Sequence, residues 1–234
     1  NVNLGLYQRI QDTTYVQRKI EGSLDYLATE DISAGVMFAS ETVVPTVRAN
    51  PVFTVYNSSY VTTGANLKID TRDDPYAPTE GILFINSYSF SIKTINGPVE
   101  YFTPSLSTSV DLQRFASSFY IFYELFSRQI VALGLNAKEL RGLSFENSDL
   151  YRLGGTNSLR GYREDQFLGS RIFWSNLEYR ALLTRRSYGF VFFDTGYYLR
   201  PEEPDRNIPK SEEFLYGFGL GLNLETALGV LRVS

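Results

Sequence analysis

The 234-residue chain contains neither cysteine nor histidine. Without cysteine it can form no disulfide and no thiolate metal site. Without histidine it lacks the commonest metal ligand, the usual general base at neutral pH and the imidazole of a catalytic triad. These absences weigh against most hydrolases and metalloenzymes. We therefore predict no enzymatic activity, no metal site and no cofactor.

Clustered positive charge and long apolar runs are also lacking. The 22 Lys and Arg residues are outnumbered by 26 Asp and Glu residues, and nucleic-acid affinity depends on clustered positive charge, so we predict no nucleic-acid partner. No apolar run approaches the roughly 18 residues that a membrane helix needs. The chain does not open with a signal peptide, and its first ten residues already alternate as a strand does, so we expect a mature protein or an excised domain.

Aromatic residues and alternation are abundant. The chain has 17 Tyr and 17 Phe against one Trp and one Met, a composition typical of strands. About ten or eleven segments alternate between apolar and polar residues and are separated by turn residues. In the segment 81–93 one face is apolar and the other polar: Ile82, Phe84, Tyr88, Phe90 and Ile92 against Ser87, Ser89, Ser91 and Lys93. In the segment 98–113 the apolar face is Phe102, Leu106, Val110 and Leu112.

Three folds are compatible with this alternation. Strands of a soluble sandwich are usually about 5 or 6 residues long, and a lipocalin-like barrel has fewer strands and an apolar interior. The segments here run to about 10 to 15 residues, which is the length that a tilted strand needs to cross a bilayer. The pattern favours an all-β fold, a transmembrane antiparallel β-barrel of the outer-membrane type, with residues 1–234 forming one domain.

Several local features complete this prediction. Asn96–Gly97 is a strong signal of a tight turn. The aromatic run 119–126 is compatible with an interfacial helix, a lipid-facing strand or a partner-binding patch, and the sequence does not distinguish them. Aromatic residues near segment ends fit the girdles at the two membrane interfaces: Tyr60, Tyr101, Phe115, Tyr188, Tyr197 and Tyr198.

The segment GGTNSLRGYRED, residues 154–165, places an arginine in a glycine-rich loop between strands. On base rates such a loop lies at the surface. The strands after it, however, turn an unusual set of residues inward: Glu178 from the first, Phe190, Phe192, Asp194 and Gly196 from the second, and Gly217, Gly219 and Gly221 from the third. Three inward glycines leave space in the lumen that something else must occupy.

The order of these motifs resembles the C-terminal half of the BamA-like outer-membrane barrels. This superfamily includes barrel-assembly factors, the bacterial surface antigen family and two-partner-secretion transporters. The resemblance rests on GGTNSLRGYRED, then FFDTG, then YGFGLGLNLETALGVLRV, with LKIDTRDDPYAPTEGILF as an earlier feature. It covers about residues 60 to 234. The resemblance implies that the loop folds back into the lumen, where its arginine meets an acidic motif on the barrel wall.

The family pattern therefore implies a lumen latch, by which we mean the contact of Arg160, Gly161 and Tyr162 at the loop tip with Phe192, Asp194 and Gly196 on the wall. Glu178 is a further inward acid. A carboxylate paired with a guanidinium suits such a confined site. The alternative is a solvated Arg160 and an Asp194 that is only a polar lumen residue.

The family barrel has sixteen strands, so we expect this chain to be incomplete, without the final strand and without the periplasmic domains. The implied function is insertion, assembly or translocation of polypeptides at the bacterial outer membrane. Its partners would be outer-membrane lipid, polypeptide clients and periplasmic or lipoprotein assembly partners. The alternative function is an outer-membrane barrel of the same fold that serves as an anchor or pore for a partner or fused domain.

Overall fold

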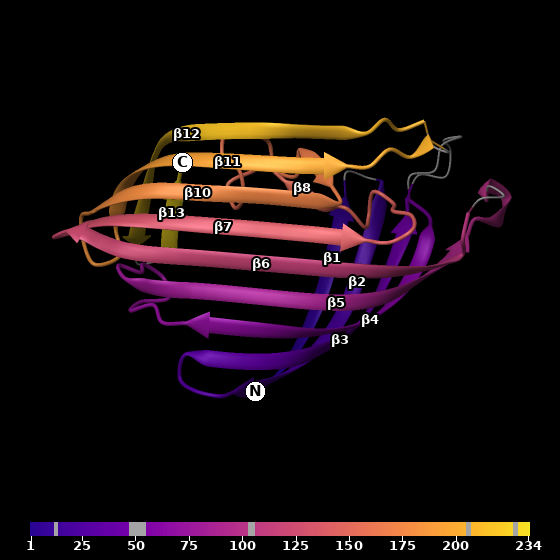
Figure 1. Ribbon diagram of the computed structural model, residues 1–234, viewed down its shortest axis with the longest axis horizontal. Helices are drawn as coiled ribbons and strands as arrows, with labels where there is room; N and C mark the ends of the chain where they lie inside the picture. The colour runs from indigo at the N-terminus through magenta and orange to yellow at the C-terminus, as the bar shows by residue number, and fades with distance from the viewer. Residues whose placement is uncertain (12–13, 47–54, 103–105, 205–206, 227–228) are drawn as a thin grey trace.

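A computed structural model describes residues 1–11, 14–46, 55–102, 106–204, 207–226 and 229–234. Eleven antiparallel strands form one curved sheet in which neighbours in the chain are also neighbours in space (Figure 1). The strands are β1 (Val2–Gln11), β2 (Tyr15–Leu27), β3 (Ile32–Pro45), β4 (Asn57–Asp70), β5 (Gly81–Gly97), β6 (Ser109–Phe126), β7 (Gln129–Arg141), β10 (Arg171–Leu182), β11 (Tyr188–Arg200), β12 (Ser211–Thr226) and β13 (Gly229–Val233). Among the described residues β1 and β13 are the edge strands, and no ladder joins them.

The two ends of the sheet differ in their connections. The short-turn rim, at the left of Figure 1, has residues 127–128 between β6 and β7 and residues 183–187 between β10 and β11. The long-loop rim, at the right, carries the segment 142–170, which contains the hairpin of β8 (Tyr151–Leu153) and β9 (Phe167–Gly169). This long loop contains residues 154–165, the loop that the family resemblance places in the lumen against the acidic motif.

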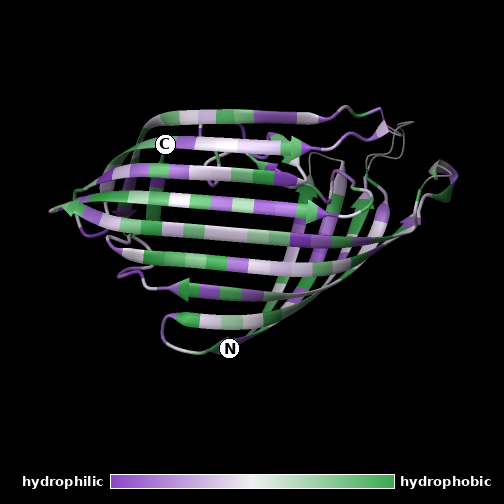
Figure 2. Ribbon diagram, viewed as in Figure 1, coloured by the Kyte–Doolittle hydropathy of each residue, from purple (hydrophilic) through white to green (hydrophobic). Residues whose placement is uncertain are grey.

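Alternation along each strand separates an outer apolar face from an inner polar face, as the banding in Figure 2 shows. On β5 the predicted faces are correct, because Ser91 and Lys93 are buried while Tyr88 and Ile92 are each 47% exposed. On β12 four outward side chains are 60–81% exposed, namely Phe214, Tyr216, Phe218 and Leu220, and Leu222 on the same face is 49% exposed. Over the described residues no helix is long and apolar enough to cross a membrane.

Near the long-loop rim the inner face is apolar. This corrects the prediction for the segment 98–113, whose apolar face would point to lipid in a transmembrane barrel. Val110 and Leu112 of β6 point inward and are 2% and 0% exposed, whereas the adjacent Asp111 is exposed. They belong to an apolar cluster that includes Leu150 of the long loop. The inward-folded loop covers this part of the sheet, so the apolar phase of the strand turns toward the loop.

The prediction of interfacial aromatic residues is wrong for three of its members. Tyr60, Tyr188 and Tyr198 are buried on the inner face, at 2%, 3% and 9% exposure. Each lies in the inward phase of its strand, where loop segments or neighbouring rings cover it. Phe115 is 39% exposed on the outer face. The side chain of Tyr101 lies outside the described residues.

Two local predictions are settled by the strand boundaries. Asn96–Gly97 does not form a tight hairpin turn, because β5 continues through Gly97 and a short 3-10 helix, η1 (Val99–Tyr101), follows it. The connection to β6 is therefore longer than a two-residue turn.

The aromatic run 119–126 is not a helix but the second half of β6. There Phe122 points inward and is 8% exposed, while Tyr123 is 63% exposed on the outer face.

Candidate lumen site

The tip of the long loop lies against the inner face of β10, β11 and β12. Arg160 is 4% exposed and Asp194 of β11 is 0% exposed. The Arg160 guanidinium donates through Nε to Asp194 Oδ2 at 2.7 Å and through Nη2 to Oδ1 at 2.6 Å. The Arg160 backbone N–H also donates to Asp194 Oδ2, at 3.1 Å. This two-oxygen geometry is the strongest pairing available to a guanidinium and a carboxylate.

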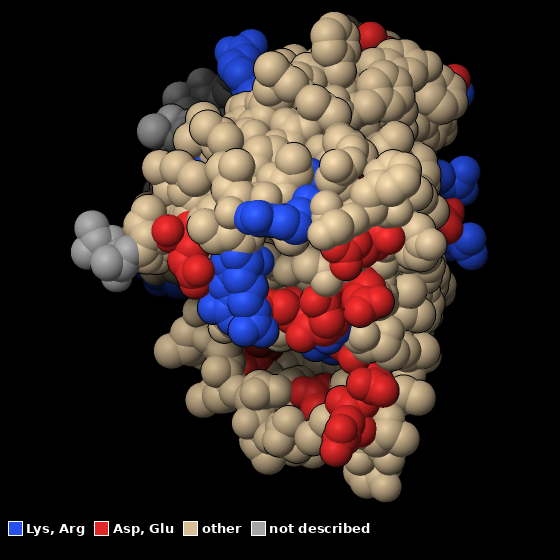
Figure 3. Space-filling model, turned by 90° about the vertical axis from the view of Figure 1, so that its left-hand side faces the viewer, with Lys and Arg blue, Asp and Glu red and all other residues tan. Residues whose placement is uncertain are grey.

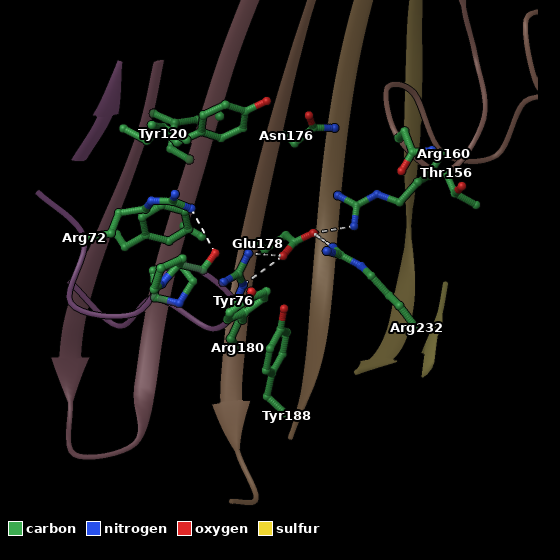
Figure 4. A pocket seen from close by; sticks show the side chains of 18 of the residues that line it. Arg72, Tyr76, Tyr120, Thr156, Arg160, Asn176, Glu178, Arg180, Tyr188 and Arg232 are labelled. Carbon is green, nitrogen blue, oxygen red and sulfur yellow. Dashed lines mark hydrogen bonds and ion pairs between the residues drawn. The ribbon is translucent and has the colours of Figure 1, made fainter. Parts of the chain in front are cut away.

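Glu178 of β10 is the second acceptor for Arg160. Arg160 Nη1 donates to Glu178 Oε1 at 2.5 Å. Arg180 Nε donates to Glu178 Oε2 at 2.9 Å, and Arg232 Nη2 donates to Oε1 at 2.5 Å. Three guanidinium groups therefore meet at one carboxylate (Figure 4). The sequence placed Glu178 inward, but it contained no signal that Arg232 of β13 would join it.

Aromatic rings form the floor beneath the guanidinium. The Arg160 Cζ atom lies 3.8 Å from the centroid of the Phe192 ring and 5.7 Å from that of Phe190. A desolvated cation over an aromatic face is held by the ring quadrupole as well as by its carboxylate partners. Phe192 thus contacts Arg160, the residue that the family pattern pairs with the FFDTG motif.

The three inward glycines make room in two different ways. A Cβ added at Gly217 would lie 2.1 Å from the Arg160 carbonyl oxygen, so this glycine admits the loop backbone itself. At Gly219 and Gly221 the added Cβ would instead meet the rings of Phe192 and Phe190, at 2.9 Å and 2.2 Å. At these two positions the occupant of the space is therefore an aromatic ring of β11 and not the loop. They admit the rings on which Arg160 lies.

The other residues of the loop tip also have defined positions. Gly161 has a φ of +91°, which an L side chain rarely adopts, although its added Cβ would meet nothing within 4 Å. Tyr162 is half-buried, and its hydroxyl donates to the Tyr216 carbonyl at 3.2 Å. Gly196 lets the loop approach β11, because its added Cβ would lie 2.9 Å from Leu159 Cδ2. The structure brings every predicted site residue onto the loop tip or the wall that faces it.

A cavity of about 450 Å³ adjoins Arg160. Its lining includes Thr156 and Arg160 from the long loop and Arg72 and Tyr76 from the segment 71–80, which enters from the opposite rim (Figure 4). Seen from the short-turn rim, blue and red side chains gather around a hollow in the surface (Figure 3). Among the described residues no group of three or more acidic, His or Cys side chains could hold a metal ion.

The segment 71–80 links two walls of the sheet, a role that the sequence did not indicate. It begins after β4, and its Asp74 contacts Arg186 of the β10–β11 turn, with Arg186 Nε donating to Oδ2 at 3.1 Å. The pKa of the Asp74 carboxyl lies below its usual value, chiefly because the backbone N–H of Tyr76 donates to it, and also because Arg186 is close. Ala77 packs beside Tyr188.

We expect Gly217→Ala to displace the loop tip, because the new methyl group would overlap the Arg160 carbonyl. Overpacking of this kind costs about 1–3 kcal/mol of folding free energy. Hydrogen exchange of residues 155–163 should increase, and the urea midpoint in lipid vesicles should fall. Gly189→Ala on β11 is the control, because its nearest neighbour would lie at an ordinary 3.7 Å. Equal behaviour of the two variants would contradict close packing of the tip at Gly217.

Comparison with known proteins places the chain in a family. A model of the Omp85 superfamily domain matches residues 29–234. Among solved structures, BamA from Haemophilus ducreyi lacking POTRA domains 1–3 is 14% identical, with a TM-score of 0.52 over 99% of this chain and 60% of that chain. CdiB from Acinetobacter baumannii is 12% identical, with a TM-score of 0.47 over 97% of this chain and 47% of that chain. No curated protein matches at a significant level.

The matches cover different shares of the chains compared, and these shares limit the conclusions. The chain spans less than two thirds of the length of either solved relative. At 14% identity the likeness to BamA concerns the fold alone. The predicted fold, an all-β antiparallel barrel of the outer-membrane type, is confirmed by this likeness and by the family match. Because the family model covers most of its residues, the chain belongs to the Omp85 superfamily.

Proposed function

We propose that the protein is an integral outer-membrane barrel that inserts, assembles or translocates polypeptides at that membrane. Membership of the Omp85 superfamily supports this proposal. The observation that carries it is the position of the long loop, which is fixed against the inner face of the sheet through the buried Arg160. A loop pinned there distinguishes this barrel from one whose lumen is a plain aqueous channel.

The outer surface supports the membrane location. On β12 the four outward side chains from Phe214 to Leu220 are apolar and 60–81% exposed. A soluble protein rarely presents such a continuous apolar band to water, whereas lipid accepts it. The inner face of the same strand carries glycine and polar residues together with the buried Leu215. Outer-membrane lipid is therefore the first partner that we propose.

The lumen latch is the second element of the proposal. Arg160, Gly161 and Tyr162 would hold the loop tip on Phe192, Asp194 and Gly196, with Glu178 as an additional acceptor. The buried two-oxygen pairing of Arg160 with Asp194 supports this role. With the loop held inside, polypeptide clients would be handled by strand pairing at the edge of the sheet, where unpaired backbone groups are available. Periplasmic or lipoprotein assembly partners would deliver them.

A disulfide across the seam of the complete barrel tests this function. Residues 1–234 contain no cysteine, so they offer no competing thiol to a pair engineered between the first and last strands of the full-length barrel. We expect oxidation to stop client assembly and reduction to restore it, because strand pairing needs an open edge. Client assembly would be measured by the appearance of folded client in lipid vesicles.

The matched control is a disulfide between Ala39 and Thr62, which face each other across the β3–β4 ladder away from the seam. It should leave assembly unchanged. If the protein locked at the seam assembles clients at the normal rate, insertion at the seam is excluded. An anchor or pore for a partner or fused domain would then be the better account of the same fold.

A further inference from the structure

A second buried ion cluster lies at the base of the long loop, away from Arg160. Lys93 Nζ donates to Asp149 Oδ2 at 2.6 Å and lies 3.3 Å from Glu146 Oε1. These three residues are 1%, 4% and 2% exposed. The two carboxylates belong to the loop, and Lys93 belongs to β5. The sequence placed Lys93 on the inner face, but its partners lie more than fifty residues further along the chain.

Neighbouring strands complete the attachment of the base. The Tyr60 hydroxyl of β4 donates to Asp149 Oδ1 at 2.9 Å, and Arg114 Nη2 of β6 donates to the same oxygen at 3.4 Å. The Glu146 backbone N–H donates to Asp149 Oδ2 at 2.9 Å, which fixes the turn that presents both acids. Three adjacent strands, β4, β5 and β6, therefore hold one short piece of the loop.

Apolar packing surrounds this cluster, and the tip has an apolar cluster of its own. Leu150 at the base packs in a cluster that draws on β2, β3, β4, β6 and β7. Leu153 and Leu159 of the hairpin and tip pack in a different cluster with side chains of β10, β11 and β12. The buried ion pairs of the base and of the tip thus lie on different walls of the sheet, although Arg200 at the end of β11 also donates to Asn147 Oδ1 of the base, at 2.7 Å, and Tyr151 packs against both apolar clusters.

The two ion clusters also balance their charges separately. At the base, Lys93 and Arg114 face Asp149 and Glu146, two positive charges against two negative charges. At the tip, Arg160 has carboxylate partners of its own on β10 and β11. Opening the tip would therefore leave no charge unpaired at the base. A buried charge that loses its partner is strongly unfavourable. Because the charges of the base are balanced among themselves, the tip can move without stranding a charge at the base.

Two glycines lie between the attachments. Gly154 and Gly155 have φ values of +117° and +96°, a backbone conformation that side-chain-bearing residues rarely adopt. They follow β8 directly and precede the tip. Positions of this kind can absorb a change in chain direction during a loop movement.

From these observations we infer that the loop has two independent buried ion-pair anchors, and that Lys93, Asp149 and Glu146 are positioning residues that hold the base while the tip is released. The inference rests on the proposed function, in which the tip leaves Asp194 during client handling. The base segment, residues 145–150, stays on β4 to β6. The tip segment, residues 155–163, moves about Gly154 and Gly155.

Hydrogen exchange of the full-length protein in lipid vesicles tests the two anchors separately. Asp194→Asn should raise exchange in the tip segment by at least about tenfold and leave the base segment unchanged. Lys93→Met should raise exchange in the base segment by a similar factor while the tip segment stays protected. Lys93→Arg, which keeps the charge, should restore protection of the base. Equal loosening of both segments by Asp194→Asn would overturn the two-anchor proposal.

A second variant covers the case in which Lys93→Met does not fold, since that change leaves two acids in the interior. Lys93→Met combined with Glu146→Gln and Asp149→Asn removes the three charges together. It should loosen the base alone, and wild-type protection of its base would overturn the role of the charges. Client assembly by Asp194→Asn is measured in parallel. Normal assembly there would count against the latch function, whereas the anchors are judged by exchange alone.

Discussion

Arg160→Ala is expected to abolish most client assembly and to lower the free energy of unfolding by about 3–5 kcal/mol, because it leaves a buried carboxylate without its partner. Asp194 is 0% exposed, and within the described residues the hydrogen bonds to its carboxylate all come from Arg160. Asp194→Ala should cost less stability, because the Arg160 guanidinium keeps Glu178 as an acceptor. Both variants should release the loop tip.

The double variant separates a shared interaction from two independent ones. Arg160→Ala combined with Asp194→Ala should be no less stable than Arg160→Ala alone, since the stranded carboxylate is gone, and its assembly defect should match that of the single variants. Arg163→Ala is the control, because Arg163 is exposed in the same loop. Strictly additive losses in unfolding midpoint and assembly rate would contradict the latch.

Phe218→Arg on the outer face of β12 is expected to destabilise the barrel in lipid by about 2–4 kcal/mol, the cost of an arginine near the bilayer midplane. Phe218 is 81% exposed, so a protein surrounded by water would tolerate the change almost without effect. The folded fraction can be followed in lipid vesicles by the faster migration of the unboiled protein on a cold gel. Phe218→Arg should therefore lower the folded fraction if β12 faces lipid and leave it unchanged if β12 faces water.

Leu143→Arg provides a matched control for this experiment. Leu143 is 95% exposed, but it lies in the long loop just after β7 instead of on a strand face. The same change from an apolar residue to arginine should therefore leave folding in lipid unaffected. If Phe218→Arg folds as well as Leu143→Arg, or if the unchanged protein is monomeric and folded in buffer without detergent, the membrane location is wrong.

The alternation of residues was sufficient to predict the strands and the faces of β10, β11 and β12. Along these strands the inward positions include Glu178, Asp194 and Gly217, and charge or the absence of a side chain marks them plainly. Period-two alternation is a local property, because successive side chains of any strand point to opposite faces. The fold class could therefore be predicted from short segments, and the family pattern indicated that Arg160 lies near Asp194.

The sequence alone could not determine which face is buried where both faces carry apolar or mixed residues. Val110, Leu112 and Tyr60 point inward and pack with Leu150 of the long loop, and the Tyr60 hydroxyl donates to Asp149 of the same loop. Lys93 with Asp149 and Arg232 with Glu178 join residues more than fifty positions apart. The periodicity of a strand says which side chains share a face, but loop closure and the path of the sheet decide which distant residues meet across the lumen.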